Sequence, residues 1–553
     1  MWSALKGIIF RHRIILLVIV LTWGVYFIAL FARMIDMRPE GFFVGHQNVW
    51  SDWALHTAQA NTFAFKSPDQ WFDYHPLFAD GKFTYPFLTN FISGMLMRLG
   101  FSLSFSFAAP SIVFVLLLLL GMYALLFQIT WSKTASFLAM TFLFLSAGFG
   151  FIDFFKDIAD NGWSLIQYPP KDYSVARQYD WYAGNISVGL LIPQRAFLLG
   201  MTLGVWILAL FYYASSTRVL TERSRKKLMC IAGCVAGIMP IAHAHSFMVV
   251  AFTTALMSLV FWRQWRLWIW FAVPATILSA FFYLQFVAGG IQREHFLGWS
   301  PGWTAPGGLW SWIVMWLTLW GLMIPTTIVG LLLFWEHFDK RQRTIFFAAF
   351  LIFTIANFVL FQPVRWDNTK LFWWSYLIFS AAAALTVVWL WRQRWSGKIL
   401  SVILVTTLTM TGIIESIRLQ RIDKHTIQVT SDEDIELGLQ IRRSTDPSAR
   451  FLTAPQHNHF IMVWALRPIL LGYTAWAWNY GFKYEQHEAD MRRIYVGVSE
   501  AEVLLRNHRI SYVVVGPTEK YDLHVNENFF QSRFPVAFSN QNYQVYDTRA
   551  LLR

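Results

Sequence analysis

This sequence contains very little cysteine and little charge. Only two of its 553 residues are cysteines, Cys230 and Cys234, and only 14% are Asp, Glu, Lys or Arg. The cysteines lie four positions apart in one apolar segment, so we expect small membrane-embedded side chains rather than a disulfide that stabilises an exported loop. Hydrophobic residues make up 56% of the chain. A soluble domain cannot bury that much apolar surface, which indicates a membrane protein.

Motifs typical of several soluble enzymes are also missing. The more polar part from residue 420 has no glycine-rich phosphate loop, no nucleophile elbow and no Cys/His metal spacing. The N-terminal apolar run "IILLVIVLTWGVYFIALF" has no small-residue cleavage site, so we expect a membrane span rather than a removed signal peptide. The net charge of +13 does not indicate nucleic acid as a partner, because Lys and Arg collect in short loops between apolar segments.

Apolar segments of about the length of a bilayer span recur along the chain. They predict a polytopic α-helical membrane protein with about eleven spans. The fifth and sixth segments are interrupted at "MPIAHAHS", which indicates short or bent helices that meet there. The expected spans cover residues 14–34, 107–130, 134–150, 197–214, 228–241, 246–262, 267–288, 309–334, 344–361, 371–391 and 399–416.

The basic clusters of the short loops fall on one side of these expected spans. They precede the first span and follow even-numbered ones, as in "STRVLTERSRKK", "DKRQR" and "RQRWSGK". The positive-inside rule then places the N-terminus in the cytoplasm and the C-terminus outside. We expect an integral protein of the bacterial inner (plasma) membrane, with the endoplasmic reticulum of a eukaryote as the alternative.

Two regions outside the spans carry most of the irregular sequence. The first exported loop, 35–106, contains "YPFLTNFISGMLMRLG", which is too short to span the membrane and predicts a juxtamembrane helix. Farther along the chain, "FIDFFKDIAD" predicts a second interfacial helix. From residue 420 the runs "RFLTA", "PILLG", "SYVVVG" and "YQVYD" are β-like, and "EAEVLLRNH" predicts an amphipathic helix. We therefore predict a membrane domain over 1–419 and an exported α/β domain over 420–553.

An acid and a histidine stand where the chain leaves the first span. In "VWSDWALHTAQANTFAF", Asp52 is flanked by Trp50 and Trp53, and His56 follows one helical turn later. One interpretation is a solvated loop acid. We favour a catalytic carboxylate, because an ionisable group placed at the membrane surface costs free energy and is more often functional. His56 either orients Asp52 or binds a ligand.

Several cations and histidines are candidates for binding a phosphate. Arg365 and Lys370 crowd the short loop "QPVRWDNTK", and the alternative is an ordinary salt-bridged loop. Arg195, at the mouth of the fourth span, either binds phosphate through its forked donors or extends to lipid headgroups. Arg293 in "QREHF" is a weaker candidate. The remaining candidates, His243 and His245, fit hydrogen bonding in a polar cavity better than metal binding.

The order of these elements resembles the GT-C class of membrane glycosyltransferases, which includes protein O-mannosyltransferases and aminoarabinose transferases. The resemblance rests on an acid near the start of the first exported loop, the "HPLFADGKFTYPF" element, many spans and an exported tail similar to those of uncharacterised bacterial members. It implies that Asp52 is the catalytic carboxylate, which acts as general base, and that Trp53 and Tyr85 line the substrate cavity. The paired acids of several branches are absent, since the sequence reads Ser51-Asp52-Trp53. We therefore expect no firm cofactor or metal ligand and keep a divalent metal as an alternative.

The resemblance also implies a reaction. Such enzymes transfer a sugar from a polyprenyl-phosphate donor to a glycan, lipid or protein acceptor outside the membrane, with inversion at the sugar. Membrane lipids, rather than nucleic acid, are the expected surroundings. Two other classes fit the same composition: a secondary transporter, which more often shows matched halves, and a non-catalytic protein of polymer assembly.

Overall fold

The computed structural model describes residues 2–45, 50–84, 86–182, 184–216, 220–289 and 297–553. It divides into two compact units, which we treat separately. Unit 1 comprises Met1–Arg33, Ser111–Gln285 and His295–His425, and unit 2 comprises Met34–Pro110, Phe286–Glu294 and Thr426–Arg553. The segment 35–106, predicted to be the first exported loop, therefore belongs to the same unit as the C-terminal tail, although more than 300 residues of unit 1 separate them along the chain.

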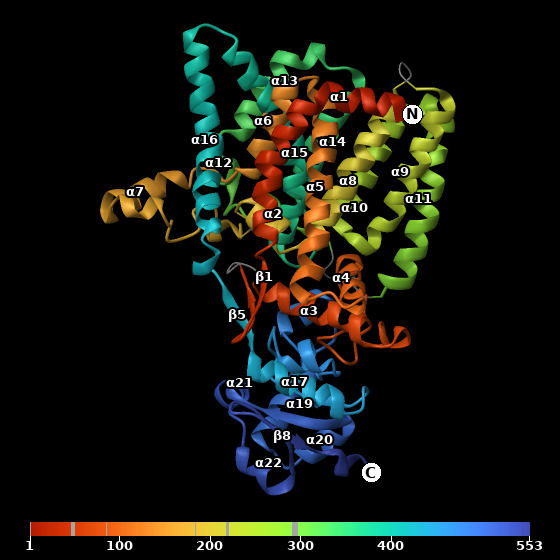
Figure 1. Ribbon diagram of the computed structural model, residues 1–553, viewed down its shortest axis with the longest axis vertical. Coiled ribbons are helices and arrows are strands. Elements are labelled where there is room, and N and C mark those ends of the chain that lie inside the picture. Colours follow the sequence, from red (N-terminus) through yellow and green to blue (C-terminus); the bar gives the residue numbers. More distant parts are fainter. Residues whose placement is uncertain (1, 46–49, 85, 183, 217–219, 290–296) are drawn as a thin grey trace. The chain divides into compact units, whose positions relative to one another are not determined.

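Unit 1 is built from helices that run side by side, visible in Figure 1 as the long coiled ribbons α5, α8, α9, α10, α11, α14, α15 and α16. Their sequences are mostly apolar. An apolar segment in lipid forms a helix because a helix satisfies its own backbone hydrogen bonds. The helices are α1 (Trp2–Ile19), α2 (Val25–Phe31), α5 (Leu103–Thr130), α6 (Lys133–Phe144), α7 (Phe151–Asn161), α8 (Arg195–Ser215), α9 (Glu222–Ala242), α10 (Ala244–Val260), α11 (Trp265–Phe286), α12 (Gly308–Trp320), α13 (Met323–Phe334), α14 (Lys340–Ala356), α15 (Thr369–Trp391) and α16 (Trp395–Gln420). Strand β3 (Gly298–Trp299) pairs antiparallel with β4 (Val359–Leu360) to form a short two-stranded sheet.

Among the described residues, six helices are long and apolar enough to cross a bilayer, or seven if the bent pair α12 and α13 is one span. The axes of that pair differ by 93°. The expected count of eleven spans is therefore not confirmed. The remaining expected segments also form helices. However, α6, α10 and α14 are shorter than a full bilayer span, and α9 begins with a charged turn. The six spans are Arg11–Phe31, Leu103–Thr130, Arg195–Ser215, Trp262–Phe286, Arg365–Trp391 and Trp395–Gln420.

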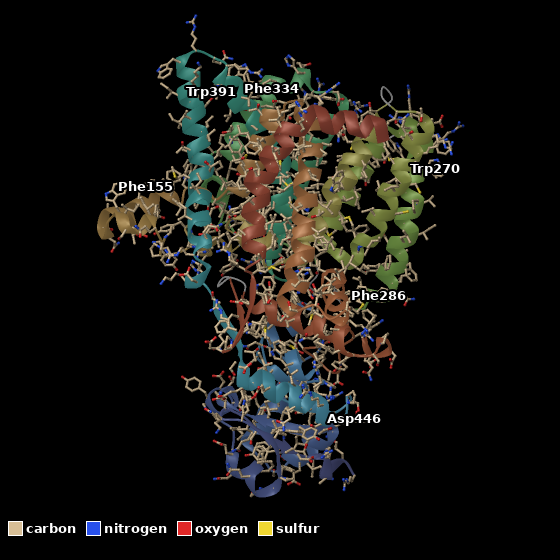
Figure 2. The ribbon with its side chains drawn as sticks, viewed as in Figure 1. Phe155, Trp270, Phe286, Phe334, Trp391 and Asp446 are labelled. Carbon is tan, nitrogen blue, oxygen red and sulfur yellow. The ribbon has the colours of Figure 1, made fainter. Side chains whose placement is uncertain are left out.

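The outer surface of α11 has the character expected of a helix in lipid. Trp270 and Ile277 are 46% and 62% exposed, and their neighbours on that face are apolar as well. Figure 2 shows Trp270 on the outside of the helix. A soluble protein rarely leaves so large an apolar face uncovered. Together with the six apolar helices, this face supports an integral membrane protein.

The basic loops of unit 1 gather at one end of its helices. Lys133 donates to the carbonyl of Arg11, with an N–O distance of 2.7 Å, and Arg225 donates to Gln264 at 2.6 Å. Lys340 donates to the carbonyl of Val260 at 3.3 Å. Phe334 and Trp391, the last residues of α13 and α15, lie at the same end (Figure 2). The tertiary contacts thus bring together clusters that are far apart in the sequence.

Unit 2 contains two sheets. The first joins the start of the first exported loop to the segment after the last span, in the order β1 (Ile35–Arg38), β2 (Gly41–Val44) and β5 (Ile427–Ser431), with antiparallel pairs. The second has the order β6 (Arg450–Leu452), β7 (Ile510–Val515), β9 (Gln544–Asp547) and β8 (Val536–Ser539). The helices of unit 2 are α3 (Trp50–Phe65), α4 (Leu88–Arg98), α17 (Asp432–Ser444), α18 (Thr474–Asn479), α19 (Glu485–Val496), α20 (Ala501–Asn507), α21 (Pro517–Tyr521) and α22 (Glu527–Arg533).

The tail follows the predicted strand pattern at three of four places. "RFLTA", "SYVVVG" and "YQVYD" contain β6, β7 and β9, and "EAEVLLRNH" contains α20. The prediction of a strand in "PILLG" is wrong: Ile469 makes only an isolated bridge to Phe451. Burial explains the apolar run there, since Ile469 is fully buried without joining a ladder. A core of side chains such as Met491, Ile494 and Val513 holds the sheet against α19 and α20.

The "HPLFADG" segment of the first exported loop is fastened to the tail within unit 2. Asp80 pairs with Arg450, at 2.8 Å between Oδ1 and Nη2, and with His487, at 2.9 Å. His75 is 1% exposed and stacks against Tyr480 and other aromatic rings. Burial lowers the pKa of His75 to about 3, so its ring stays neutral. The motif that the sequence highlighted therefore holds the loop against the tail.

Candidate functional site

Asp52 lies in the first turn of α3, which follows β2 in the chain. Its side chain is partly exposed, whereas Trp53 and His56 are buried, at 0% and 5% exposure. The positive end of a helix dipole stabilises a carboxylate in this position. His56 follows at i+4 on the same face of the helix. The predicted catalytic pair is thus placed on one helical stripe, with the acid at its accessible end.

Two amides that sequence reasoning missed complete this cluster. Gln59 extends the stripe by one turn, and Asn90 faces it from α4. The Nδ2 atom of Asn90 lies 2.9 Å from Nδ1 of His56 and donates to Oε1 of Gln59 at 2.6 Å. Gly94 allows the two helices to meet, because a Cβ there would lie 2.6 Å from the carbonyl oxygen of Ala60. The only signal in the sequence was the presence of amides in otherwise apolar stretches. We call Asp52, His56, Gln59 and Asn90 the acid–histidine cluster.

The structure gives fewer contacts for three other predicted residues, Trp53, Tyr85 and Arg293. The ring of Trp53 packs 6.3 Å from that of Phe107, and its Nε1 has no hydrogen-bond partner among the described residues. Tyr85 and Arg293 lie outside the described residues. The role of Trp53 in a cavity therefore stays a prediction, as do those of Tyr85 and Arg293.

A second group of predicted residues lies in unit 1, at the beginnings of three helices that pack against one another. Arg195 is the first residue of α8, His243 and His245 flank the start of α10, and Lys370 is the second residue of α15. The ring of Phe197 on α8 packs 5.3 Å from that of His243, and Trp374 on α15 donates to Ser246 on α10 at 3.1 Å. We call Arg195, His243, His245 and Lys370 the cationic cluster.

Charge and burial give the cationic cluster its chemistry. Arg195 is fully buried, and its Nε donates to Ser111 at 3.0 Å. Lys370 lies within electrostatic range of both imidazoles. Three helix N-termini add partial positive charge to the cations, so the cluster favours an anion. It stands at the end of unit 1 opposite the basic loops, because α8, α10 and α15 all start here and end there.

The structure treats the two cations of "QPVRWDNTK" differently. Lys370 is buried and pairs with Asp367, 2.5 Å from Nζ to Oδ1. Arg365 is exposed, and its backbone carbonyl accepts a hydrogen bond from Trp303 at 3.0 Å. Asn368 holds the loop by donating to the carbonyls of Ala356 and Val359. The loop therefore brings Lys370, but not the side chain of Arg365, into the cationic cluster.

A buried ionic group at the end of α16 was not foreseen. Arg418 binds both oxygens of Glu415 and pairs with Asp172, in the loop between α7 and α8, at 3.5 Å. His425 stands 3.3 Å from Arg418, and its pKa is lowered to about 4 by burial and by that cation. These contacts fasten the loop to the helix. Within the described ranges, no three His, Cys, Asp or Glu side chains are arranged to hold a metal ion.

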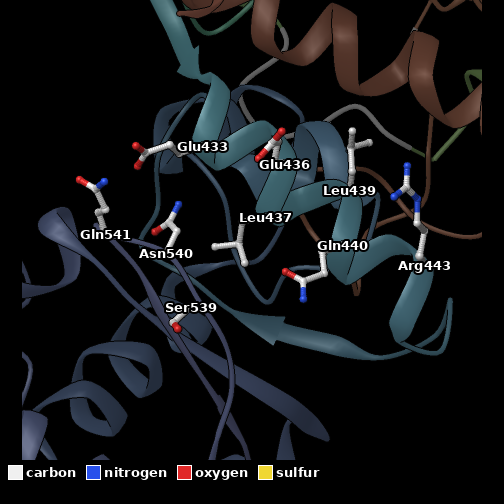
Figure 3. A pocket seen from close by; sticks show the side chains of 9 residues that line it. All are labelled: Glu433, Glu436, Leu437, Leu439, Gln440, Arg443, Ser539, Asn540 and Gln541. Atoms are coloured by element: carbon white, nitrogen blue, oxygen red, sulfur yellow. The ribbon is translucent and has the colours of Figure 1, made fainter.

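A polar pocket of about 520 Å³ opens on the tail (Figure 3). It lies between α17, which contributes Glu433, Glu436 and Arg443, and the turn after β8. Asn540 at its edge is already bound to Asp434 at 2.8 Å. The pocket contains none of the residues predicted to act in catalysis, so the candidate residues are those of the two clusters, each considered within its own unit.

Comparison with known proteins supports the fold. No protein-family model and no curated protein matches the chain. The oligosaccharyltransferase of Archaeoglobus fulgidus in its apo form is 11% identical, over 93% of this chain and 70% of its own, with a TM-score of 0.54. ArnT from Cupriavidus metallidurans in the apo state is 11% identical, over 99% of each chain, with a TM-score of 0.50.

A second structure of the archaeal enzyme, AglB bound to an inhibitory peptide and dolichol-phosphate, is 11% identical over 91% of this chain and 70% of its own, with a TM-score of 0.50. At this level of identity the likeness concerns the fold alone. The chain is thus similar in fold to the archaeal oligosaccharyltransferase and to ArnT.

Proposed function

We propose that this protein is an inverting glycosyltransferase that uses a polyprenyl-phosphate-linked sugar as donor. The observation that carries the proposal is the cationic cluster, in which two basic side chains lie at the starts of helices in a chain of GT-C-like fold. A phosphate monoanion or diester has the charge and the acceptor oxygens that such a cluster binds. The dolichol-phosphate held by the archaeal neighbour supports the same class of donor.

The reaction needs one base and one stabilised leaving group. An acceptor hydroxyl attacks the anomeric carbon, a new C–O bond forms, and the C–O bond to the phosphate breaks with inversion. Asp52 takes the proton of the attacking hydroxyl. Lys370 and Arg195 stabilise the charge that develops on the departing polyprenyl phosphate. Arg365 and Arg293 are further candidates for that contact, and the neutral imidazoles of His243 and His245 offer hydrogen bonds in the cavity.

The proposed topology follows from the charges. With the basic loops in the cytoplasm, the N-terminus is cytoplasmic and the cationic cluster faces the other side. We therefore assign 1–419 to the membrane domain of a bacterial inner-membrane enzyme and 420–553 to an exported domain. The tail supports the site or binds the acceptor, which is a glycan, lipid or protein. A divalent metal stays an alternative to which we assign no step.

The test uses the purified full-length protein in liposomes. Mass spectrometry identifies lipids that copurify, and the protein is then given polyprenyl-phosphate sugars with a panel of hydroxyl acceptors. We expect release of free polyprenyl phosphate together with a glycosylated acceptor. No turnover with any donor, in a preparation that binds no polyprenyl phosphate, would contradict the proposal.

One observation favours a transporter instead. The sharply bent pair α12 and α13 is a broken span or a re-entrant loop, and broken helices are common in secondary transporters. The same liposomes distinguish the two functions. Uptake of a labelled solute without any change in the donor lipid would establish transport, whereas donor cleavage without uptake establishes transfer.

A further inference from the structure

The contact between α3 and α4 contains a polar group that the reaction as described does not use. His56, Gln59 and Asn90 are 5%, 0% and 0% exposed. A buried amide costs free energy unless its hydrogen bonds are made, so its retention between two helices calls for a reason. Oδ1 of Asn90 and Nε2 of Gln59 have no protein partner among the described residues. The hydrogen bonds that Asn90 and Gln59 do make are thus directed toward His56 and toward each other, while part of each amide stays without a protein partner in the described part of the chain.

The direction of the hydrogen bond to His56 follows from the atoms involved. An amide nitrogen carries two hydrogens and no acceptor lone pair. Asn90 gives one hydrogen to Oε1 of Gln59, at 2.6 Å, and the other faces Nδ1 of His56, at 2.9 Å. Nδ1 must therefore be an unprotonated acceptor. A neutral imidazole in this state carries its single hydrogen on Nε2.

The geometry of the helix then gives that hydrogen a direction. Side chains on an α-helix lean toward its N-terminus, so a residue at i+4 covers the residue at i. His56 accordingly leans toward Asp52. With Nδ1 facing Asn90, we assign the Nε2–H donor to the side of the ring that leans toward Asp52.

We propose that Asn90 is a positioning residue, which, with Gln59, holds His56 in the tautomer that carries hydrogen on Nε2 and presents it as a donor beside Asp52. The inference rests on the proposed function for its catalytic meaning, but the tautomer itself does not depend on activity. The relation resembles that of a carboxylate or amide that orients a histidine from behind in other enzymes. It adds a residue of α4 to a site that the sequence placed on α3 alone.

The direct test is spectroscopic and uses the full-length protein labelled with [15N]histidine. The signals of His56 are assigned by their loss in His56→Ala. We expect a protonated Nε2 and an unprotonated Nδ1 in the wild type. Asn90→Asp replaces the donor by an acceptor, so Nδ1 should become protonated. Thr89→Ala, a buried change at the adjacent position, should leave the His56 signals unmoved. A wild-type ring protonated on Nδ1, or an unchanged ring in Asn90→Asp, would overturn the proposal.

A double-mutant cycle tests the catalytic consequence. Asn90→Ala should lower kcat by about 10–100-fold, the usual loss when the partner that orients a histidine is removed, with the KM for the donor nearly unchanged. In a His56→Ala background the same change should have no further effect. Equal losses in both backgrounds would show that Asn90 does not act through His56. A wild type that transfers no sugar would instead reject the proposed function, and the spectroscopic test would still decide the tautomer, with Asn90→Ala in place of Asn90→Asp if the latter fails to fold.

Discussion

Asn61 of α3 donates its Nδ2 hydrogen to the backbone carbonyl of Val463, at 2.7 Å, across 402 positions of sequence. Val463 belongs to a buried π-helical turn, Ile461–Ala465, in the tail. The helix that carries Asp52 is therefore held by the C-terminal part of the chain. A supporting role of the tail, which we propose above, is consistent with this contact.

Removing this hydrogen bond should loosen unit 2. Asn61→Ala leaves a buried carbonyl without its donor, which costs about 1–3 kcal/mol. We expect that loss in the free energy of unfolding measured by denaturant titration in detergent. Asn542→Ala, an exposed change in the tail, is the matched control and should lie within about 0.5 kcal/mol of the wild type. Equal stability of the two variants would show that the contact contributes nothing.

Asp52→Asn should abolish most of the transfer while preserving the fold. The amide keeps the shape of the side chain but cannot take the proton, and a positioned base contributes about 10²–10⁴-fold to rate. The measurement is kcat with a polyprenyl-phosphate sugar, alongside donor binding, which should be retained. Asp69→Asn, an exposed acid of the same loop, serves as control. More than about a tenth of the wild-type kcat in Asp52→Asn would transfer the role to Asp73 or Asp172.

Lys370 should contribute to donor binding through its charge. Lys370→Ala alone would strand the buried Asp367, so the informative variant is Asp367→Asn with Lys370→Met, which removes both charges. Loss of a charge-assisted contact should weaken donor binding by about 1.5–3 kcal/mol, or about 10–150-fold. Titration of a polyprenyl phosphate measures it.

Two single variants serve as comparisons for the donor affinity of the double variant. Arg365→Ala should cost less than about 1 kcal/mol of donor affinity, because its side chain is exposed and screened by water. Lys398→Ala removes an exposed cation from the opposite end of unit 1 and should have no effect. Full affinity in the double variant would move the phosphate contact to Arg195.

His75 should make unit 2 sensitive to acid. Its pKa is about 3 in the folded protein against 6.5 in the unfolded chain, so between these values only the unfolded chain binds the proton. Stability is therefore unaffected above pH 6.5 and falls as the pH drops below it. From pH 7.5 to 5 the loss due to His75 should be about 2 kcal/mol.

His75→Phe isolates that contribution. The variant should lose less stability than the wild type between pH 7.5 and 5, by about the same 2 kcal/mol. His524→Asn removes an exposed histidine at a left-handed backbone position that asparagine tolerates, and its curve should parallel the wild type. Parallel curves for His75→Phe and the wild type would mean that His75 is protonated in the folded state.

Much of the helical framework could be predicted from sequence because membrane helices satisfy their backbones locally. The runs that became α5, α8, α15 and α16 are recognisable by length and hydropathy alone. The number of spans was not predictable in the same way. Segments such as α6 and α10 are helical and apolar but short, and local composition does not tell a short span from a buried helix.

The sequence by itself also determined which residue types were available for chemistry, and where. Asp52 and His56 share a helical face because they are four positions apart. Lys370 lies in the first turn of α15 because the apolar run of that helix begins directly after it. Such relations are local, so spacing is enough to predict them.

Only the tertiary structure decided which of these residues meet. Strand β5 adds to β1 and β2, Asn90 reaches His56 from another helix, and Lys370 joins His243 at the start of α10 while Arg365, five residues earlier, stays exposed. Each of these pairings closes a long loop and is selected by packing and by the need to satisfy buried polar groups, to which a single sequence read locally gives no access.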